Sequence, residues 1–470
     1  MKISFHGAAR TVTGSKHLLH LASGKKLLLD CGMFQGMGKD TTKLNSDWGF
    51  EPSEIDHVII SHAHIDHVGL LPKLVKDGYA GKIYCTPATA SLAKLLLLDS
   101  AHIQEADVRY VNKHRAKENR ELVAPLYTEE DALDVFPLFE TIPYNEHYHI
   151  DNGIELMYTD CGHILGSAAV NLKIMEDGKP VRVTFSGDIG RYRDMLLRSP
   201  QEFPQADYII MESTYGNSLH DLVAAANDKL LHHIEQTCIE NKGKLIIPAF
   251  SLGRTQEILY MLNRLELERR LPKLNYYVDS PLSIKITNTV KRYPDHFNGN
   301  VRNLLKIDED VFKFNGLQYV ESVEESMALN DTKDPCVIIS ASGMAEAGRV
   351  KHHIAHNISD ARNTIMFTGY CEPYSLGGRL KRQPDMVKIF GHEYVVKAAI
   401  DEISSLSAHG DYEDMSQWLA CQDPRTVKKL FLVHGEYDVQ EAFRQRLIRK
   451  GFLDVEIPSL HQEIGLGKME

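Results

Sequence analysis

HAHIDH, at residues 62–67, places four side chains of metal-ligand type within six positions. The stretch follows the apolar run HVIIS and precedes an apolar pattern of helical period, so it joins a predicted strand to a predicted helix. In an extended segment, residues two apart point the same way, and His62 and His64 can therefore hold one metal ion together. Asp66 and His67, around the turn, can face a second ion. The hexapeptide predicts a metal site at a strand end.

More donors are needed elsewhere, because two zinc sites each take about four to five ligands with one position left for water. Three candidates stand just after predicted strands: His163 in DCGHILGS, Asp188 in FSGDIG and His434 in LVHGE. Taken alone, each of them could equally be a capping or turn residue. Together with the hexapeptide they predict a dinuclear centre.

The first 205 residues are dominated by strand and turn signals. KHLLHL (16–21) and KKLLLD (25–30) flank a short turn, which predicts a hairpin. A helix is expected over 68–76, and a long one over 88–121 that starts apolar and ends highly charged. Further strands are expected at 155–160, 169–174 and 181–186.

From about residue 207 strands alternate with helices. The predicted strands are 208–212, 244–250, 274–280, 336–342 and 363–370, with helices near 221–240, 255–270, 282–292 and 348–357 between them. Strands spaced by helices indicate parallel βαβ units and hence a doubly wound α/β domain. A later apolar strand is expected at 429–435.

Composition restricts the class of protein. The chain has 470 residues, enough for about two to four domains. Its net charge of -11 argues against a general nucleic-acid binder, so a polyanionic substrate would need local positive charge. Seven widely spaced cysteines without a C-x-x-C pair favour free thiols in a reducing cytoplasm. No apolar run approaches the ~18 residues of a membrane span, so we expect a soluble cytoplasmic enzyme and no membrane partner.

The order H-x-H-x-D-H, G-H and S-G-D resembles the metallo-β-lactamase superfamily. MESTYG (211–216), SAHGD (407–411) and LVHGE (432–436) resemble the three motifs of its β-CASP group, which includes RNase J and the nuclease subunit of the pre-mRNA cleavage and polyadenylation machinery. The resemblance implies an α/β protein, a metallo-β-lactamase αββα sandwich with an inserted doubly wound α/β β-CASP domain. The expected division is 1–205 and 393–470 for the sandwich and 206–392 for the insert, as in a compact bacterial form with only these two domains.

The resemblance also assigns roles. It implies two Zn²⁺, the first held by His62, His64 and His163, the second by Asp66, His67 and His434. Asp188 would bridge them together with a hydroxide, and Asp30 would orient the cluster without binding it, its alternative being a plain turn residue. The function implied is hydrolysis of RNA phosphodiester bonds by this two-metal-activated hydroxide. The catalytic residues would be Asp66, Glu212 and His409, with Glu212 orienting His409 and raising its pKa, unless the two form only a structural ion pair.

Two small-residue loops, PAFSLGRTQE (248–257) and ISASGMAEAGR (339–349), lead from strands into helices, where backbone N–H groups attract phosphate. Similar segments line the RNA channel of β-CASP relatives. The candidate phosphate- and RNA-binding residues are Ser251, Arg254, Ser342, Gly343 and Arg349, with ordinary βα turns as the alternative. The expected partner is RNA, single-stranded for preference, and a homodimer is compatible with the resemblance.

Three other functions stay open. A hydrolase of the same fold could act on a thioester, a lactam or a DNA phosphodiester, although the large insert argues against a small substrate. A diiron oxidoreductase would carry more carboxylates, and His64 favours zinc instead. A catalytically inactive RNA-binding scaffold would have lost ligands, whereas all seven positions are filled here.

Overall fold

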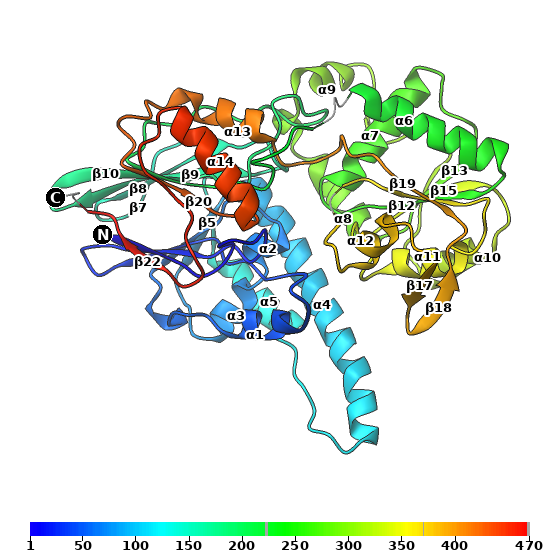
Figure 1. The fold of residues 1–470 in the computed structure, drawn as a ribbon, viewed down its shortest axis with the longest axis horizontal. Helices are drawn as coiled ribbons and strands as arrows, with labels where there is room; N and C mark the ends of the chain where they lie inside the picture. The colour runs from blue at the N-terminus through cyan, green and yellow to red at the C-terminus, as the bar shows by residue number, and fades with distance from the viewer. Residues whose placement is uncertain (221–223, 370, 468–470) are drawn as a thin grey trace. The chain divides into compact units, whose positions relative to one another are not determined.

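The computed structural model describes residues 1–220, 224–369 and 371–467 (Figure 1). For residues 224 and 225 it describes the backbone and not the side chains. The chain forms two compact units. Unit 1 comprises Met1–Tyr192, Ser199–Leu219 and His409–Glu470, and unit 2 comprises Arg193–Arg198 and His220–Ala408. Every described helix is too short or too polar to cross a bilayer.

The first sheet of unit 1 has seven strands in the order β22-β1-β2-β3-β4-β5-β6. The predicted hairpin is confirmed, since β2 and β3 pair antiparallel with His17 opposite Leu29. From β3 to β6 the neighbours run parallel. The strands are β1 (Lys2–Phe5), β2 (His17–His20), β3 (Lys26–Leu29), β4 (His57–Ile59), β5 (Lys82–Cys85), β6 (Phe139–Thr141) and β22 (Glu463–Gly465).

The second sheet of unit 1 has the order β21-β20-β11-β10-β9-β8-β7. From β10 through β11 and β20 to β21 the strands run parallel. This sheet therefore joins segments that are more than 200 residues apart, because β11 lies between β10 and β20. The strands are β7 (Tyr148–Asp151), β8 (Ile154–Asp160), β9 (Ala168–Glu176), β10 (Lys179–Phe185), β11 (Tyr208–Met211), β20 (Lys429–Leu432) and β21 (Val455–Glu456).

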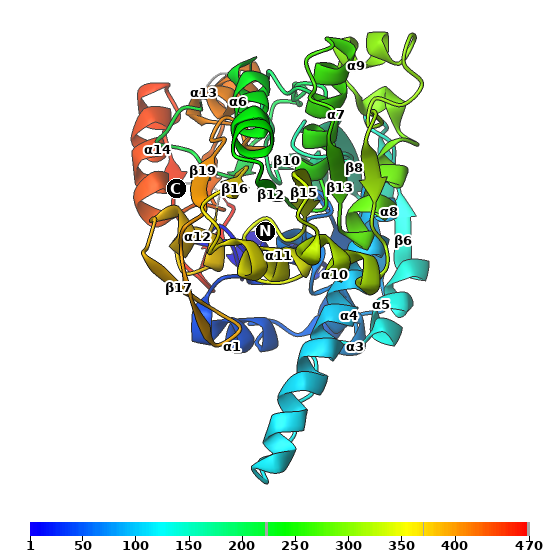
Figure 2. The ribbon, with the colours of Figure 1, turned by 90° about the vertical axis from the view of Figure 1, so that its right-hand side faces the viewer.

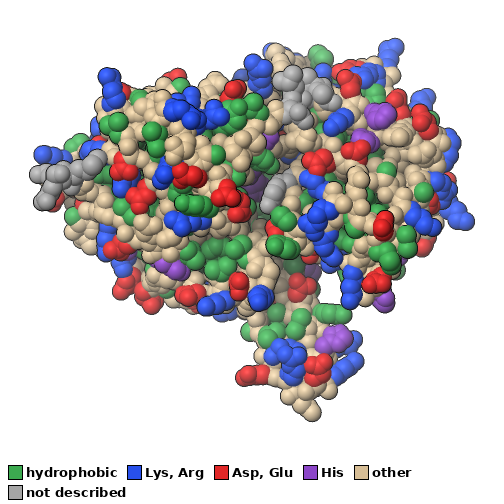
Figure 3. Space-filling model, viewed as in Figure 1, with side chains coloured by type: hydrophobic (Ala, Val, Ile, Leu, Met, Phe, Trp, Pro, Cys, Tyr) green, Lys and Arg blue, Asp and Glu red, His purple; other side chains and the backbone are tan. Residues whose placement is uncertain are grey.

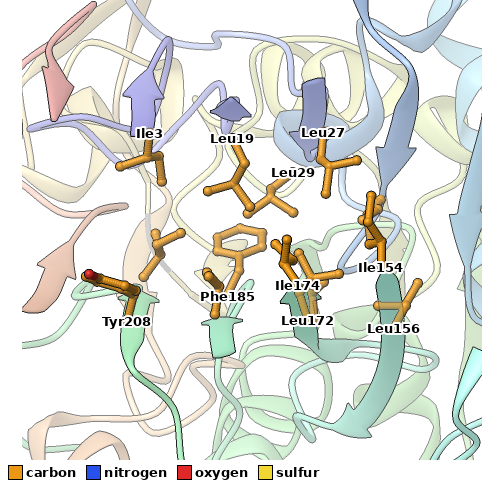
Figure 4. Packing of buried hydrophobic residues seen from close by; sticks show 14 of the residues in the cluster. Ile3, Leu19, Leu27, Leu29, Ile154, Leu156, Leu172, Ile174, Phe185 and Tyr208 are labelled. Carbon is orange, nitrogen blue, oxygen red and sulfur yellow. The ribbon is translucent and has the colours of Figure 1, made fainter. Parts of the chain in front are cut away.

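The two sheets pack face to face around one hydrophobic core (Figure 4). Ile3, Leu19 and Leu27 of the first sheet face Leu172 and Phe185 of the second, as alternation along each strand requires. Helices cover both outer faces (Figure 1), which confirms the expected αββα sandwich. They are α1 (Thr41–Ser46), α2 (Ile65–Val68), α3 (Leu71–Lys76), α4 (Pro87–Lys117) and α5 (Glu129–Val135) on the side of the first sheet, and α13 (Tyr412–Trp418) and α14 (Tyr437–Arg449) on the side of the second.

Two predicted helices differ in detail. The helix expected over 68–76 begins only at Leu71 and is α3, with Pro72 in its first turn. Val68 is instead the last residue of α2, which starts inside the hexapeptide. The long helix expected over 88–121 is α4. It begins at Pro87, where Thr86 accepts a capping hydrogen bond from Thr89, and it ends at Lys117.

Unit 2 is built on a six-stranded sheet in the order β14-β13-β15-β12-β16-β19, in which every pair is parallel. Helices lie on both faces of it (Figure 2), so the expected doubly wound domain is confirmed. Its first predicted strand, 208–212, is instead β11 of unit 1, where it pairs with β10 and β20. The strands of the six-stranded sheet are β12 (Lys244–Pro248), β13 (Asn275–Val278), β14 (Leu317–Tyr319), β15 (Cys336–Ser340), β16 (Thr364–Phe367) and β19 (Ala399–Glu402). A separate hairpin joins β17 (Met386–Ile389) to β18 (His392–Val395).

Helices of unit 2 bury apolar side chains against this sheet. Val350 and Ile354 of α11, for example, pack with Ile365 and Phe367 of β16. The helix expected over 221–240 is described from Ala224 on and continues as a π-helical turn from Glu235; residues 221–223 of that prediction lie outside the described residues. The helices are α6 (Ala224–Ile234), α7 (Arg254–Leu267), α8 (Pro281–Val290), α9 (Gly299–Leu304), α10 (Val323–Asp331), α11 (Arg349–Asn357) and α12 (Leu376–Lys381).

Candidate metal and active site

The predicted metal donors all lie in unit 1, and each follows the carboxyl end of a strand. The hexapeptide follows β4 and contains the first three residues of α2, and His163 follows β8. Asp188, Glu212 and His434 follow β10, β11 and β20. Because β10, β11 and β20 are parallel neighbours, their carboxyl ends meet at one edge of the second sheet. The carboxyl edge of parallel strands is where α/β folds place their ligands.

The backbone turns sharply at two of these strand ends. Asp30 after β3 and His434 after β20 both adopt left-handed conformations, with φ of 58° and 48°. Asp and His tolerate this region better than most residues, and such conformations cluster at functional sites. Gly187 permits a similarly close approach, since a Cβ there would stand 2.4 Å from the Cβ of Ser61. The loop that carries Asp188 is thus brought against the end of β4.

One group of donors combines His62, His64, His163 and Asp188, whose ligand atoms all lie within 4.8 Å of one another. His64 Nδ1 lies 3.2 Å from Nε2 of both His62 and His163. Asp188 Oδ2 lies 3.4 Å from His62 Nε2 and 3.6 Å from His163 Nε2. Three imidazoles and one carboxylate therefore converge on one point.

A second group combines Asp66, His67 and His434. Asp66 Oδ2 lies 3.2 Å from His434 Nε2 and 3.7 Å from His67 Nε2. Asp188 connects the two groups, because its Oδ2 is also 3.4 Å from His67 Nε2 and its Oδ1 is 3.7 Å from His434 Nδ1. The structure brings all seven predicted ligands together, with Asp188 between the two sets.

These donors fit a pair of divalent cations. His67 Nε2 and Asp188 Oδ1 are buried and have no hydrogen-bond partner among the described residues, which is costly unless another group satisfies them. Imidazoles outnumber carboxylates five to two in the two groups, and this mixture suits zinc and other divalent transition metals.

Two histidines show the electrostatics of the site. Burial lowers the pKa of His64 to about 4, so its imidazole is neutral and able to bind a metal. Burial also acts to lower the pKa of His67, but the carboxylates of Asp188, Asp66 and Asp30 outweigh it and raise that pKa well above the usual value. A bound cation would therefore balance the negative charge of the carboxylates around His67.

Asp30 orients the hexapeptide from behind. Its Oδ2 lies 2.6 Å from His67 Nδ1, and its two oxygens accept hydrogen bonds from the backbone N–H and the hydroxyl of Ser61. Because Nδ1–H donates a hydrogen bond to Asp30, Nε2 is the ring nitrogen that would give up its proton to a bound cation. Ser61 also contacts His62 Nδ1 at 3.0 Å. Ser61 is a residue of the site that sequence reasoning missed, although it stands directly before the hexapeptide.

Glu212 and His409 form a pair beside the metal donors. His409 Nδ1 lies 3.0 Å from Glu212 Oε2, and Glu212 is fully buried. Burial lowers the pKa of His409, but the carboxylates of Glu212 and Asp188 outweigh it and raise that pKa to about 9. Thr214, another residue that sequence reasoning missed, donates to Glu212 Oε2 at 2.6 Å and stands 3.1 Å from His434 Nδ1. Its place in MESTYG, two residues after Glu212, was the available signal.

The five predicted RNA-binding residues lie in unit 2, where acidic partners engage both arginines. Arg254 is buried and pairs with Glu257. Arg349 Nη1 donates to Asp279 at 2.6 Å, and its Nη2 donates to the carbonyl of Glu321 at 2.7 Å. Of the others, Ser251 is buried, Ser342 Oγ donates to the Ala347 carbonyl, and a Cβ on Gly343 would clash with Phe250.

Three family models match the chain. Residues 18–154 match the metallo-beta-lactamase superfamily, residues 255–380 the Beta-Casp domain, and residues 393–458 the Zn-dependent metallo-hydrolase RNA specificity domain. The last two models cover most of the chain beyond residue 254.

Curated relatives match along nearly the whole chain. Ribonuclease TTHA0252 of Thermus thermophilus is 34% identical over 451 residues, 96% of this chain and 97% of the relative. An RNase J-like protein of Methanocaldococcus jannaschii is 30% identical over 438 residues, 92% of each chain. Cleavage and polyadenylation specificity factor 73 of Drosophila melanogaster is 27% identical over 448 residues, 94% of this chain and 61% of the relative.

Proposed function

The chain belongs to the β-CASP group of the metallo-β-lactamase superfamily, and from this premise we propose that it is a zinc-dependent ribonuclease that hydrolyses RNA phosphodiester bonds. The observation that carries the proposal is the joining of two donor groups at Asp188, which lies 3.4 Å from both His62 and His67. At that position Asp188 would be a ligand common to both groups, as two cations that act on one phosphodiester require.

In this proposal each zinc ion has its own ligands. His62, His64 and His163 would hold one ion, Asp66, His67 and His434 would hold the other, and Asp188 would serve both. Bound there, the ions supply an activated water and neutralise charge on the phosphate oxygens. Asp30 keeps His67 in the tautomer that can bind a metal, and Ser61 fixes Asp30 in turn.

His409 is the proposed proton donor to the leaving oxygen of the cleaved bond. Its Nδ1 is held by Glu212, so the proton for the leaving oxygen would come from Nε2. Glu212 is itself fixed by the backbone N–H of Ile189 and the hydroxyl of Thr214. A carboxylate fixed in this way orients the imidazole and favours its protonated form. Glu212 is therefore a positioning residue, and His409 the group that touches the phosphate.

The residues predicted to recognise the substrate remain proposals. Ser251, Arg254, Ser342, Gly343 and Arg349 are proposed to contact single-stranded RNA, the arginines subject to the acidic partners described above. Because Arg349 already satisfies Asp279, any phosphate contact would come from its remaining donors. A homodimer and a cytoplasmic location also stay predictions, which light scattering and cell fractionation would check.

The proposal is tested with the purified full-length chain, zinc, and single-stranded RNA labelled at either end. We expect cleavage that a chelator stops and zinc restores, with about two zinc ions per chain by elemental analysis. The label that appears in the first products separates internal cleavage from stepwise removal at the 5′ end. The His64→Ala variant should be inactive, whereas His147→Ala, an exposed histidine of the same unit, should cleave normally.

Assays with other substrates define the result that would contradict the proposal. Nitrocefin, a thioester and single-stranded DNA are assayed beside the RNA under the same conditions. RNA left intact together with turnover of the thioester or the lactam would refute the ribonuclease proposal. Iron found bound in place of zinc would contradict the assignment of zinc.

A further inference from the structure

The outer half of α4 and the segment that returns from it form an arm, residues 102–126. None of these residues is buried, whereas Ala101 before them and Tyr127 after them are. Figures 1 and 2 show the helix running out beyond the rest of unit 1. At 1.5 Å per residue, Lys117 stands about 24 Å past Ala101 along the helix axis. The active site described above contains no residue of this arm.

One side of the arm helix holds the returning segment. Asn112 makes two hydrogen bonds to the backbone of Val123, at 2.8 and 2.9 Å. Arg115 donates from its Nε to the carbonyl of Glu121. These contacts give the arm a fixed shape, so the opposite side of the helix is a preformed surface.

That opposite side, the outer face, carries Ile103, Asp107, Tyr110, Lys113, His114 and Lys117. Their spacing of three, four and seven residues places them on one face of the helix. Tyr110 is 68% exposed, and its ring centre lies 4.9 Å from that of His114. Ion pairs of the arm join His102 to Glu129, Arg109 to Glu105 and Arg120 to Glu118. Lys113 and Lys117 have no such partner among the described residues.

The arm as a whole has five lysines and arginines and four acidic residues, and the basic ones are concentrated in its outer part. Residues 109–120 contain five lysines and arginines and one acidic residue, in a protein with net charge -11. In Figure 3 the projecting part shows basic, histidine and hydrophobic side chains beside a few acidic ones. A positive stripe interleaved with exposed rings is complementary to a nucleic acid, because phosphates attract the lysines and bases stack on the rings.

We propose that the outer face of the arm binds the RNA substrate at a distance from the site of cleavage. Lys113 and Lys117 contact backbone phosphates, and Tyr110 with His114 offers a stacking surface for bases. This inference rests on the proposed ribonuclease function, since it takes RNA as the ligand. The arm extends the binding site only for RNA long enough to reach it, so short and long substrates differ.

Three full-length proteins, all in the Asp66→Asn background to keep RNA intact, test the binding. The first has no further change. The arm variant adds Lys113→Glu and Lys117→Glu, and the control adds Lys179→Glu and Lys450→Glu, two exposed lysines of unit 1 with the same change of charge. Circular dichroism and thermal unfolding establish that all three fold alike.

Affinity for a labelled single-stranded RNA of about 30 nucleotides is measured by fluorescence anisotropy at several salt concentrations. We expect the arm variant to bind about tenfold or more weakly, and its slope of log K against log salt to be shallower by about 1.4, two phosphate contacts at 0.7 each. The control should match the parent within about twofold. A Tyr110→Ala variant should lower affinity with an unchanged salt slope, because stacking releases no counterions.

In the active background, the arm changes should lower kcat/KM about tenfold for the long RNA and leave that for an RNA of about five nucleotides unchanged. Equal binding by arm variant and control overturns the inference. So does a dimer, seen by light scattering, that the arm changes dissociate without loss of RNA affinity, because the face would then belong to a second copy. Binding needs no turnover, so a protein that binds through the arm without cleaving RNA would contradict the proposed function alone.

Discussion

His434 Nε2 lies 3.2 Å from Asp66 Oδ2, although 368 residues separate them in the chain. The contact exists because β20 inserts beside β11 and ends at the same edge as the strands that carry the other donors. The second group of donors is therefore complete only when the C-terminal segment has joined the sheet. Metal binding and the folding of unit 1 are coupled through this pair.

Replacing His434 by alanine should remove about one zinc ion per chain and lower RNA cleavage by at least about 100-fold, because one of the two sites loses a ligand. Elemental analysis and a cleavage assay measure the two effects. His149→Ala, at a histidine 79% exposed in the same unit, is the matched control and should change neither. Full zinc content in His434→Ala would exclude His434 as a ligand.

Asp30→Asn keeps the shape of the side chain but removes the charge that faces His67. We expect zinc affinity to fall about 10- to 100-fold with the fold intact, as for other groups that orient a ligand from behind. Competition with a chromophoric chelator measures the affinity. Ser15→Ala removes only a hydrogen bond of 3.3 Å to the same carboxylate and should have a much smaller effect. Equal effects of the two changes would contradict the orienting role.

Loss of the proposed proton donor should separate chemistry from metal binding. His409→Ala is expected to lower kcat about 10²- to 10⁴-fold with little change in KM, and Glu212→Gln to lower kcat less. Zinc content should stay that of the wild type in both. Glu212 also lies within 4.8 Å of donor atoms of Asp188 and His434. Zinc lost together with activity would therefore make Glu212 a ligand and remove the positioning role.

A buried carboxylate in unit 2 should make stability depend on pH. Burial raises the pKa of Asp279, but hydrogen bonds from His353, Ser326 and Arg349 outweigh it and hold that pKa below the usual value. The stabilisation is then fully present above the unfolded-state pKa of about 3.9 and is lost as pH falls through the lower folded-state pKa. Asp279→Asn should cost about 3 kcal/mol at neutral pH, and less below about pH 4.

Urea unfolding of Asp279→Asn and the wild type at both pH values measures this difference. Asp295→Asn, at an exposed position of the same unit, should change the free energy of unfolding by no more than about 0.5 kcal/mol at either pH. A cost for Asp279→Asn that does not change with pH would show that its charge is not what stabilises the unit.

Chelation should destabilise the protein as well as stop cleavage, because His67 Nε2 and Asp188 Oδ1 are buried without hydrogen-bond partners among the described residues. At a free zinc concentration of about 100 times Kd, binding contributes about 2.7 kcal/mol, or a shift in Tm of about 5–10 °C. Differential scanning calorimetry with and without chelator measures the shift. His62→Ala should respond less, and an equal response would place the stabilising metal elsewhere.

Much of the site could be predicted from local sequence. The hexapeptide needs only the alternation of an extended segment and one turn to bring its donors together, so its meaning is written in residues 62–67. The hairpin of β2 and β3 and the parallel sheet of unit 2 follow likewise from short apolar runs and what separates them. The roles of Glu212, His409 and His434 required the resemblance to β-CASP motifs, since no local spacing relates residues so far apart.

Only the tertiary structure determined what those side chains contact. Strand order is a long-range property, and it alone sets Asp188 between two groups of histidines and Thr214 between Glu212 and His434. The loops of unit 2 read as phosphate sites, yet Asp279 engages Arg349, and nothing in the sequence near Arg349 announces that partner. From sequence alone, the charged end of α4 looks like an ordinary solvent-exposed helix. Only the structure shows that none of its residues from 102 on is buried. Sequence fixes which chemistry is available, whereas packing decides which donors are satisfied and which remain for a ligand.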